Sequence, residues 1–444
     1  MESPPHPLTD NTALLLLEGY AWLPDRMRRT ADTVLRTRLA GRPAVALRGP
    51  EAVRFFYDEH HVHRHGALPE PVRGTLFGDG PVHTLDGEQH RLRKAMFLSL
   101  LTPPARIADL AEYVTAAWDE AERAWGRQPS VVLFDEAAKV LTLGVCRWAG
   151  VPLDAGHQAA PGPVEVTGNT RPGDRAPADG LVEAMARDLV AMVDGFATPG
   201  PRHWQARTAR RRREDLLAAF VERVRAGDVS VPEDSVVAAV VHHRDSDGRT
   251  LDARTAAVEL LNVLRPTAAI AWFVAFAAHA LHRWPECRER LRGDDRAYAA
   301  AFAHEVRRFY PFAPFVGGLA TADLSWQGVR IPEGTLVLLD VYGQNHDAGL
   351  WGDPYTFRPQ RFLDRPVERD ELIPQGGGDP GSGHRCPGEA VTIALLEALS
   401  VRLARLEYDV PAQDLTIPLR RIPTRPRSGF VISGVRRAAV TASA

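Results

Sequence analysis

The sequence is poor in cysteine, and that scarcity excludes two classes of protein. Its three cysteines are Cys146, Cys287 and Cys386. They are too few and too scattered for a disulfide framework, and none belongs to a pair with the spacing of a zinc site. A chain of this kind suits a reducing compartment, so we expect a cytoplasmic protein.

The chain also lacks long apolar runs and a charge of one dominant sign. The longest largely apolar run covers residues 267–281, whereas a membrane span needs roughly 20 residues. The N-terminus carries proline and acid where a secretory signal needs positive charge. The formal net charge is -2, so no global field favours nucleic acid or an anionic membrane. We therefore expect no nucleic-acid partner and no membrane insertion.

Helical periodicity dominates what the sequence does contain. The longest helical segment is apolar almost all round after Arg265, which is typical of a helix through the centre of a molecule. Strands are few and short, and a Gln327-Gly328 turn predicts a hairpin. The expected fold class is mainly α with small β-sheets. The main predicted helices are 107–125, 136–148, 254–284, 295–310 and 387–406, and the predicted strands are 43–47, 324–326, 329–331 and 335–341.

Cys386 stands between a glycine-rich loop and a predicted helix. Residues 376–389 are Gly-Gly-Gly-Asp-Pro-Gly-Ser-Gly-His-Arg-Cys-Pro-Gly-Glu, with Pro387 where proline often starts a helix. Unpaired N–H groups at that helix end can hold sulfur as a thiolate, the form that ligates iron. Gly377 and Gly378 would let the backbone approach a flat macrocycle. From these residues alone, a packed or redox-reactive thiol is the more common interpretation of such a cysteine.

Two further motifs precede this cysteine. Glu305 and Arg308 form Glu-x-x-Arg on a predicted helix, where both side chains share a face. Residues 357–362 are Phe-Arg-Pro-Gln-Arg-Phe. Glu305 and Arg308 alone would be an ordinary helix pair. In this order before Cys386, however, the motifs resemble the cytochrome P450 superfamily, in which the pair joins a downstream arginine, here Arg361, in a structural network under a heme.

The departures from the common P450 pattern are as informative as the match. Asp379, Ser382 and His384 stand at the places of the Phe, Gly and basic residue of the usual heme loop. The central helix has Arg265-Pro266 where oxygen-activating P450s carry an acid-alcohol pair. Both departures resemble the bacterial fatty-acid peroxygenases of the superfamily, which have Gln-Gly-Gly-Gly before a lengthened loop and Leu-Arg-Pro in the central helix.

This resemblance extends over nearly the whole chain, and it implies a cytochrome P450 fold with residues 1–444 as a single catalytic domain. The main mismatch is the segment at about 154–179, a Gly/Pro-rich stretch without periodicity that we interpret as an insertion. The resemblance also implies heme b, iron protoporphyrin IX, with Cys386 as its axial metal ligand. It implies a fatty-acid substrate, hydrogen peroxide as co-substrate and no obligatory redox partner.

Arg265 is the expected substrate anchor. A buried arginine must be paired, and an ion pair with a neighbouring acid such as Glu259 is the ordinary interpretation. Pro266 removes a hydrogen bond to the carbonyl of Asn262 and kinks the helix, which opens room for a head group. In the branch that the sequence resembles, the matching arginine binds the fatty-acid carboxylate. That carboxylate can then serve as the general acid–base group, and the anchor presents the α and β carbons for oxidation.

Three cations are candidates for the heme propionates. His90 and Lys94 lie four residues apart on a predicted helix, so they share a face, and cations bind carboxylates well. The alternative is an ordinary surface helix. The resemblance favours propionate binding, with Arg64 as a further candidate.

His83 and a set of apolar residues complete the predicted site. In the branch that the chain resembles, the position of His83 lies on the distal side of the heme and is occupied by histidine in a member that decarboxylates fatty acids to terminal alkenes. Since several hydroxylating relatives also have histidine there, we expect mainly hydroxylation with some decarboxylation. The resemblance also implies a substrate-lining set, for each of which ordinary core packing is the alternative: Phe77, Phe312, Ala313, Phe315 and Val316.

Two other functions fit the same fold. One is a P450 monooxygenase that receives electrons from a redox partner, against which Arg265-Pro266 and the missing acid-alcohol pair argue. The other is a non-catalytic heme-binding sensor, which would need no carboxylate anchor. Turnover with peroxide alone separates both from a peroxygenase.

Overall fold

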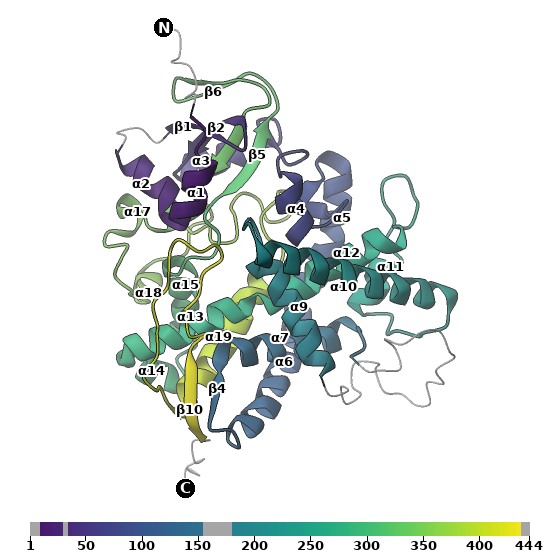
Figure 1. Cartoon of the computed structure of the whole chain (residues 1–444), viewed down its shortest axis with the longest axis vertical. Coiled ribbons are helices and arrows are strands. Elements are labelled where there is room, and N and C mark those ends of the chain that lie inside the picture. The colour runs from purple at the N-terminus through teal and green to yellow at the C-terminus, as the bar shows by residue number, and fades with distance from the viewer. Residues whose placement is uncertain (1–8, 30–33, 154–179, 437–444) are drawn as a thin grey trace.

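The computed structural model describes residues 9–29, 34–153 and 180–436. One end of the molecule combines the N-terminal strands and short helices with strands from the second half of the chain, and long helices form the larger body (Figure 1). The predicted insertion at about 154–179 lies outside the described residues. The mainly α architecture with small sheets, expected from periodicity, is confirmed.

Long helices build the body and most of the hydrophobic core. Their bounds are α5 Gly87–Leu101, α6 Pro104–Trp125, α7 Leu133–Ala149, α9 Leu181–Asp194, α10 Pro201–Ala226, α11 Val236–Val241, α12 Ala253–Ala268, α13 Ile270–Arg283, α14 Pro285–Arg292, α15 Arg296–Phe309 and α19 Glu389–Arg405. Side chains of α6, α7, α13 and α19 pack in one cluster that includes Trp118, Trp125 and Trp272. The last helix begins at Glu389, so the prediction of a start at Pro387 is wrong: Pro387 lies in a turn and Gly388 is the N-cap.

Short helices and strands form the smaller end and the edges. The helices are α1 Thr12–Glu18, η1 Gly19–Ala21, α2 Trp22–Arg29, α3 Pro50–Phe56, α4 Glu70–Leu76, η2 Val82–Thr84, α16 Val341–Asn345, α17 Ala348–Trp351 and α18 Arg361–Asp364. The strands are β1 Val34–Leu39, β2 Arg42–Leu47, β3 Val62–His63, β4 Ser130–Val132, β5 Val316–Ala320, β6 Leu324–Trp326, β7 Val329–Ile331, β8 Leu336–Leu339, β9 Glu407–Asp409 and β10 Val431–Arg436.

The sheets join segments that are far apart in the sequence. Five strands form a sheet in the order β1-β2-β8-β5-β3, and three form another in the order β4-β10-β9. Strands β2 and β8 run parallel, with Ala44 opposite Leu336. The β6–β7 hairpin turns at Gln327 and Gly328, whose φ angles are 47° and 78°. Two positive φ values are what a tight primed turn requires, so the predicted hairpin is confirmed.

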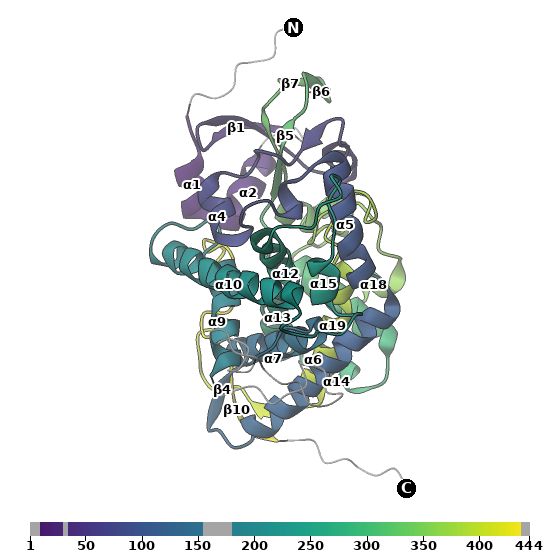
Figure 2. The same ribbon diagram turned by 90° about the vertical axis from the view of Figure 1, so that its right-hand side faces the viewer.

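The central helical run passes through the core and breaks near Pro266. Asp252 caps α12 by accepting the N–H groups of Arg254 and Thr255. Ala269 separates α12 from α13, three residues after a proline that has no N–H to donate. The run is long and apolar enough to cross a membrane by length and composition, yet 94% of its most apolar window is buried inside the protein. Figure 2 shows α10 lying across α12 at the centre of the molecule.

The predicted network of Glu305 with two arginines is confirmed. Arg308 Nε lies 2.8 Å and Arg361 Nε 3.1 Å from the same carboxylate oxygen of Glu305. Arg308 also donates to the carbonyls of Asn345 and Pro354, at 2.8 and 2.9 Å. Removing one partner of such a buried ion pair typically costs about 3–5 kcal/mol, because the other charge is left unpaired. The network therefore ties α15 to the segments that precede the Cys386 loop.

Candidate active site

The Cys386 loop is held in place by main-chain and side-chain hydrogen bonds. The N–H of Cys386 donates to the carbonyl of Gln375 at 3.2 Å. Lys94 Nζ donates to the carbonyl of Gly383 at 2.7 Å and also to that of Arg385. Burial raises the pKa of the Cys386 thiol, and a hydrogen bond from the Gly388 N–H acts in the opposite direction. A cation bound to this sulfur would offset the burial, so the site suits a metal-bound thiolate.

Gln375 is a contact of Cys386 that the sequence did not reveal. Its Nε2 lies 3.9 Å from Cys386 Sγ and donates to Thr392 Oγ1 at 2.9 Å. Arg307 Nε donates to Gln375 Oε1 at 3.1 Å. Since arginine can only donate, this bond fixes the amide with its NH2 group toward the sulfur. Gln375 therefore supplies a side-chain donor beside the predicted ligand, and only the folded contacts identify it.

The prediction that Gly377 and Gly378 leave room for a flat macrocycle needs a correction, because protein atoms lie close beside both glycines. A Cβ on Gly377 would lie 2.2 Å from Val53 Cγ1, and one on Gly378 would lie 2.6 Å from the Cβ of Tyr57. Gly378 also has a φ of 74°, which other residues rarely adopt. The close approach that excludes a side chain is thus to α3 and the residue after it. A role of these glycines in cofactor binding stays a prediction.

The three predicted propionate-binding cations are buried, and the structure gives each a different setting. The rings of His90 and His384 stack at 3.9 Å. Burial lowers the pKa of His90 to about 3 and that of Lys94 to about 8. His90 Nδ1 is buried without a hydrogen-bond partner in the described part of the chain. Arg64 donates to the carbonyl of Gly317 at 2.6 Å and lies over the ring of Phe56.

These features fit a bound heme. A buried ring nitrogen without a partner normally signals a missing acceptor, and carboxylates are the acceptors that buried cationic residues prefer. His384, which stacks on His90, has its Nε2 3.4 Å from Asp86 Oδ1. This histidine therefore already has a carboxylate partner within the protein. Lys94 and Arg64 would supply the positive charge for two propionates, and the neutral His90 ring would donate an N–H hydrogen bond to one of them. In this structure, however, the Lys94 ammonium binds loop carbonyls.

Arg265 is buried, with 4% of its surface exposed, and its partners are neutral. Its guanidinium donates to Asn262 Oδ1 at 2.8 Å and to the carbonyl of Leu76. Among the described residues no carboxylate forms an ion pair with it. The alternative of an Arg265–Glu259 ion pair is therefore wrong, because Glu259 pairs with Arg93 at 2.6 Å. Burial lowers the pKa of Arg265 to about 10, so the guanidinium stays charged at neutral pH.

His83 and Phe77 lie beside this arginine. The Phe77 ring centroid is 4.7 Å from the His83 ring centroid. The Arg265 guanidinium carbon is 5.8 Å from the centroid of the Phe77 ring. His83 Nδ1 is buried without a hydrogen-bond partner among the residues described. Burial, and then the charge of Arg265, lower the pKa of His83 to about 3. The three residues expected on the distal side are thus together, and the imidazole is neutral.

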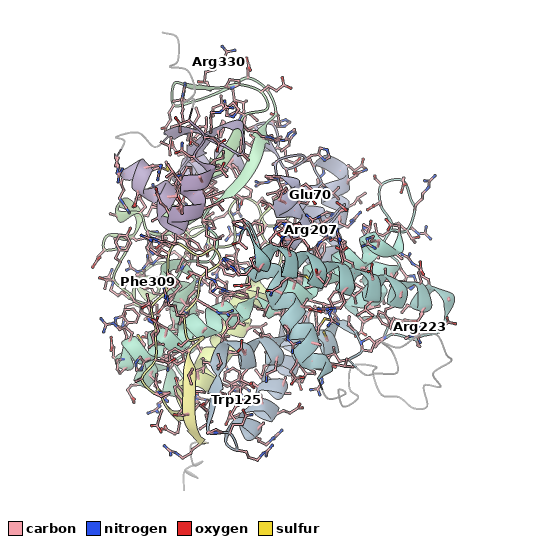
Figure 3. All side chains as sticks on the ribbon, viewed as in Figure 1. Glu70, Trp125, Arg207, Arg223, Phe309 and Arg330 are labelled. Atoms are coloured by element: carbon pink, nitrogen blue, oxygen red, sulfur yellow. The ribbon has the colours of Figure 1, made fainter. Side chains whose placement is uncertain are left out.

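Packing of α4 on α10 sets the position of Phe77 and of the Leu76 carbonyl. Figure 3 shows Glu70 and Arg207 close to one another on these helices, and their ion pair is 2.8 Å long. Arg210 Nε donates to the carbonyl of Gly74 at 2.7 Å. Two arginines of α10 therefore hold the short helix that ends at the site.

The other predicted lining residues do not share one surface. Phe312 packs on the helical core, where its ring is 4.9 Å from that of Phe273. Ala313 and Val316 pack against a cluster of the five-stranded sheet. Phe315 packs on a separate cluster with Trp22 and Leu23. All four side chains are partly buried against a core cluster, and substrate lining stays a prediction for each of them.

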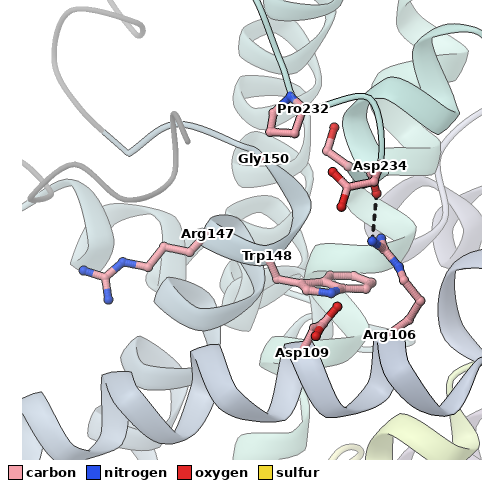
Figure 4. Close-up of a pocket in the computed structure, with 8 residues that line it drawn as sticks. Arg106, Asp109, Arg147, Trp148, Gly150, Pro232 and Asp234 are labelled. Carbon is pink, nitrogen blue, oxygen red and sulfur yellow. Dashed lines mark hydrogen bonds between the residues drawn. The ribbon is translucent and has the colours of Figure 1, made fainter. Parts of the chain in front are cut away.

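A small surface pocket elsewhere contains none of the predicted residues. It is lined by α6, α7 and the segment before α11 (Figure 4). Arg106 donates to the carbonyl of Asp234 at 2.8 Å, and its guanidinium lies over the ring of Trp148. The residues that line this pocket include neither Cys386 nor Arg265 nor any residue that contacts them in the interactions described above.

Comparisons with known proteins agree with this arrangement. The family model of cytochrome P450 matches residues 293–414. Cytochrome P450 137 of Mycobacterium tuberculosis is 26% identical over 366 residues, which cover 80% of this chain and 73% of that protein. The structure of cytochrome P450SP alpha in complex with (R)-ibuprophen is similar, with 39% identity, a TM-score of 0.88 and coverage of 97% of this chain and 99% of that one.

Two further similar structures contain fatty acids. Cytochrome P450EX alpha with myristic acid is 35% identical, with a TM-score of 0.89 and coverage of 99% of this chain and 100% of that one. A variant of cytochrome P450 OleT in complex with arachidonic acid is 37% identical, with a TM-score of 0.87 and 97% of each chain covered.

Proposed function

This chain belongs to the cytochrome P450 family, in the branch that includes cytochrome P450SP alpha, and on that premise we propose that it is a heme-thiolate peroxygenase. It uses hydrogen peroxide to hydroxylate fatty acids at the α or β carbon. The observation that carries the proposal is Arg265, a buried guanidinium with neutral partners among the described residues. An anion from outside the chain is the natural partner of such a charge.

Four residues of the chain would hold the heme. Cys386 would bind the iron through its thiolate, Lys94 and Arg64 would balance the propionate charge, and the neutral His90 would donate a hydrogen bond to a propionate. The heme, once bound, supplies the oxidising chemistry, and the thiolate ligand favours cleavage of the peroxide O–O bond. Gln375 and the Gly388 N–H donate to the sulfur and so moderate its basicity.

Arg265 binds and orients the substrate. A guanidinium can hold a carboxylate through two parallel hydrogen bonds, which fixes the acid end of the chain beside Phe77 and His83. The carbons next to the carboxylate are then the ones held for reaction, which explains α or β selectivity by proximity. Pro266 contributes by ending regular α12 shortly afterwards.

The substrate carboxylate also moves the proton. No acid-alcohol pair occupies this part of the central helix, so the carboxylate held by Arg265 transfers a proton between the two oxygens of hydrogen peroxide. His83, being neutral, can donate one N–H hydrogen bond to the reacting group and accept one hydrogen bond at its other ring nitrogen. This supports some decarboxylation to a terminal alkene beside the main hydroxylation. No redox partner is needed.

The test is turnover with peroxide alone. Heme-loaded protein is incubated with myristic acid and hydrogen peroxide, without reductase or NAD(P)H, and the products are analysed by mass spectrometry. We expect α- or β-hydroxymyristate and a smaller amount of the alkene that is one carbon shorter. Product formed only with a reductase system would indicate a partner-dependent monooxygenase, and no product in either condition would indicate a heme-binding sensor. Either result contradicts the proposal.

A further inference from the structure

Behind Arg265 lies a buried chain of polar side chains that ends at a carboxylate. Arg265 donates to Asn262 Oδ1 at 2.8 Å, and Asn262 Nδ2 donates to Glu259 Oε2 at 2.6 Å. Glu259 is fully buried and Asn262 is 6% exposed. All three residues belong to α12, at positions three apart, so they lie along one face of the helix. The chain therefore connects the predicted anchor to a group about one and a half turns away.

Among the described residues, every neighbour that binds the Glu259 side chain is a hydrogen-bond donor. Besides Asn262, its carboxylate accepts from Arg93 at 2.6 Å and from the N–H of Val82 at 2.9 Å. Arg93 is itself held by Asp245, whose oxygen lies 3.1 Å from Arg93 Nε. An ionised carboxylate is the one side chain that can only accept, through two oxygens. The site thus needs an acceptor at both Glu259 oxygens.

The carboxylate determines which way the Asn262 amide points. Because Glu259 accepts the amide NH2 group, the amide oxygen must face Arg265. If glutamine replaced Glu259, its NH2 group would take the place of one carboxylate oxygen and would donate. Asn262 would then have to turn its own amide oxygen toward that NH2 group. Its NH2 group would then face the Arg265 guanidinium, donor against donor. Such an unsatisfied contact is costly in a buried position.

From this geometry we propose that Glu259 is a positioning residue that holds the Arg265 guanidinium, through Asn262, in the orientation that receives the fatty-acid carboxylate. The inference rests on the proposed function, since it assumes that Arg265 is the anchor. Val82, which binds the same carboxylate, is the residue before His83. Glu259 therefore also ties α12 to η2, the segment that carries the second distal residue.

A binding titration with a double-mutant cycle tests the proposal. Heme-loaded full-length protein is titrated with myristic acid, and the spin-state change in the heme absorption gives the Kd. We expect Glu259→Gln and Asn262→Ala each to weaken binding about tenfold, the size of one lost hydrogen bond to a charged group. In an Arg265→Ala background, Glu259→Gln should change the Kd by less than about twofold, because coupled residues are not additive.

The controls separate positioning from general damage. Asp188→Asn removes another buried carboxylate that pairs with an arginine, Arg213 at 2.6 Å, between α9 and α10, and should leave the Kd unchanged. Asn262→Ala keeps the Glu259–Arg93 pair and so tests the proposal even if Glu259→Gln fails to fold.

Three results would overturn the inference. Equal weakening by Glu259→Gln in both backgrounds, or no weakening by either Glu259→Gln or Asn262→Ala, shows that Arg265 does not depend on this chain, although it would leave the anchor intact. If Arg265→Ala itself leaves the Kd unchanged, the anchor in the proposed function fails, and the inference falls with it.

Discussion

Arg265 differs from three other buried arginines, Arg93, Arg308 and Arg361, in what surrounds it. Arg93, Arg308 and Arg361 each form an ion pair with a buried glutamate. Arg265 is held by a carbonyl and an amide oxygen, so its charge is oriented but not neutralised locally. The same helix thus contains Glu259, a carboxylate paired with Arg93, and, six residues later, Arg265, a guanidinium whose partners are neutral. This separation of opposite charges is the feature on which the proposed carboxylate-binding role of Arg265 rests.

Gln375 provides a prediction on the other side of the site. Its amide donates toward Cys386 Sγ, and hydrogen bonds to a ligating sulfur reduce the electron density that it gives to iron. Replacing Gln375 by leucine should therefore make the ferric/ferrous reduction potential of the heme-loaded protein more negative. A spectroelectrochemical titration measures it. Gln128→Leu, at an exposed position, is the control. A Gln375→Leu potential equal to that of the unmodified protein would show that the 3.9 Å contact has no influence on the ligand.

At the scale of elements, two interruptions of regular structure lie beside the candidate site. One is the break between α12 and α13, near Arg265, and the other is the loop before α19, which contains Cys386. Both depend on residues that cannot continue regular structure: Pro266 in the helix and Gly378, with its positive φ, in the loop. The sequence indicates these breaks directly. It does not indicate what the loop packs against, because Val53 and Tyr57 lie more than three hundred residues earlier.

His346 joins two elements near the Glu305 network and makes the stability depend on pH. Its Nδ1 lies 2.9 Å from the carbonyl of Tyr342 in α16, and its Nε2 lies 3.1 Å from that of Phe309 in α15. It is 7% exposed. Burial, and then the charge of Arg308, lower the pKa of His346 to about 4. The neutral form is therefore the one that the folded protein favours.

The direction of the effect follows from this depressed pKa. The stabilisation is fully present above the unfolded pKa of about 6.5 and is lost as pH falls through about 4, where the folded protein also takes up the proton. Over that interval the His346 contribution should decrease by about 3 kcal/mol at most. We expect His346→Asn to have a shallower loss of unfolding free energy between pH 6.5 and 4, measured by urea titration. His60→Asn, at an exposed position, should keep the steeper loss; identical slopes for all three proteins would refute the assignment to His346.

At the scale of the whole molecule, periodicity and motifs predicted much of the architecture. The helix over residues 107–125, the β6–β7 hairpin and the Glu305–Arg308–Arg361 network are present as expected. These features depend on local spacing or on a motif with a fixed order. The start of α19 was misplaced because Pro387 suits the first turn of a helix and equally suits the turn before it.

The unpredicted parts of the site are contacts between distant segments. Glu259 binds Arg93 and the N–H of Val82, and Gln375 binds Arg307, across 68 to 177 residues. The spacing around Glu259 and around Gln375 in the sequence predicts neither contact. An arginine such as Arg93 can pair with any acid that lies near it in the fold. Tertiary packing decides the partner, which is why Glu259 pairs with Arg93 and not with Arg265 on its own helix.

The central claim is that hydrogen peroxide is the oxidant and oxygen donor, and isotopic labelling tests it most directly. Heme-loaded protein is given myristic acid and peroxide with both oxygens replaced by oxygen-18, in unlabelled water and air, and the hydroxy acid is analysed by mass spectrometry. The account predicts one oxygen-18 atom in the new hydroxyl group. A hydroxy acid that carries oxygen from air, and appears only when a reductase supplies electrons, would contradict it.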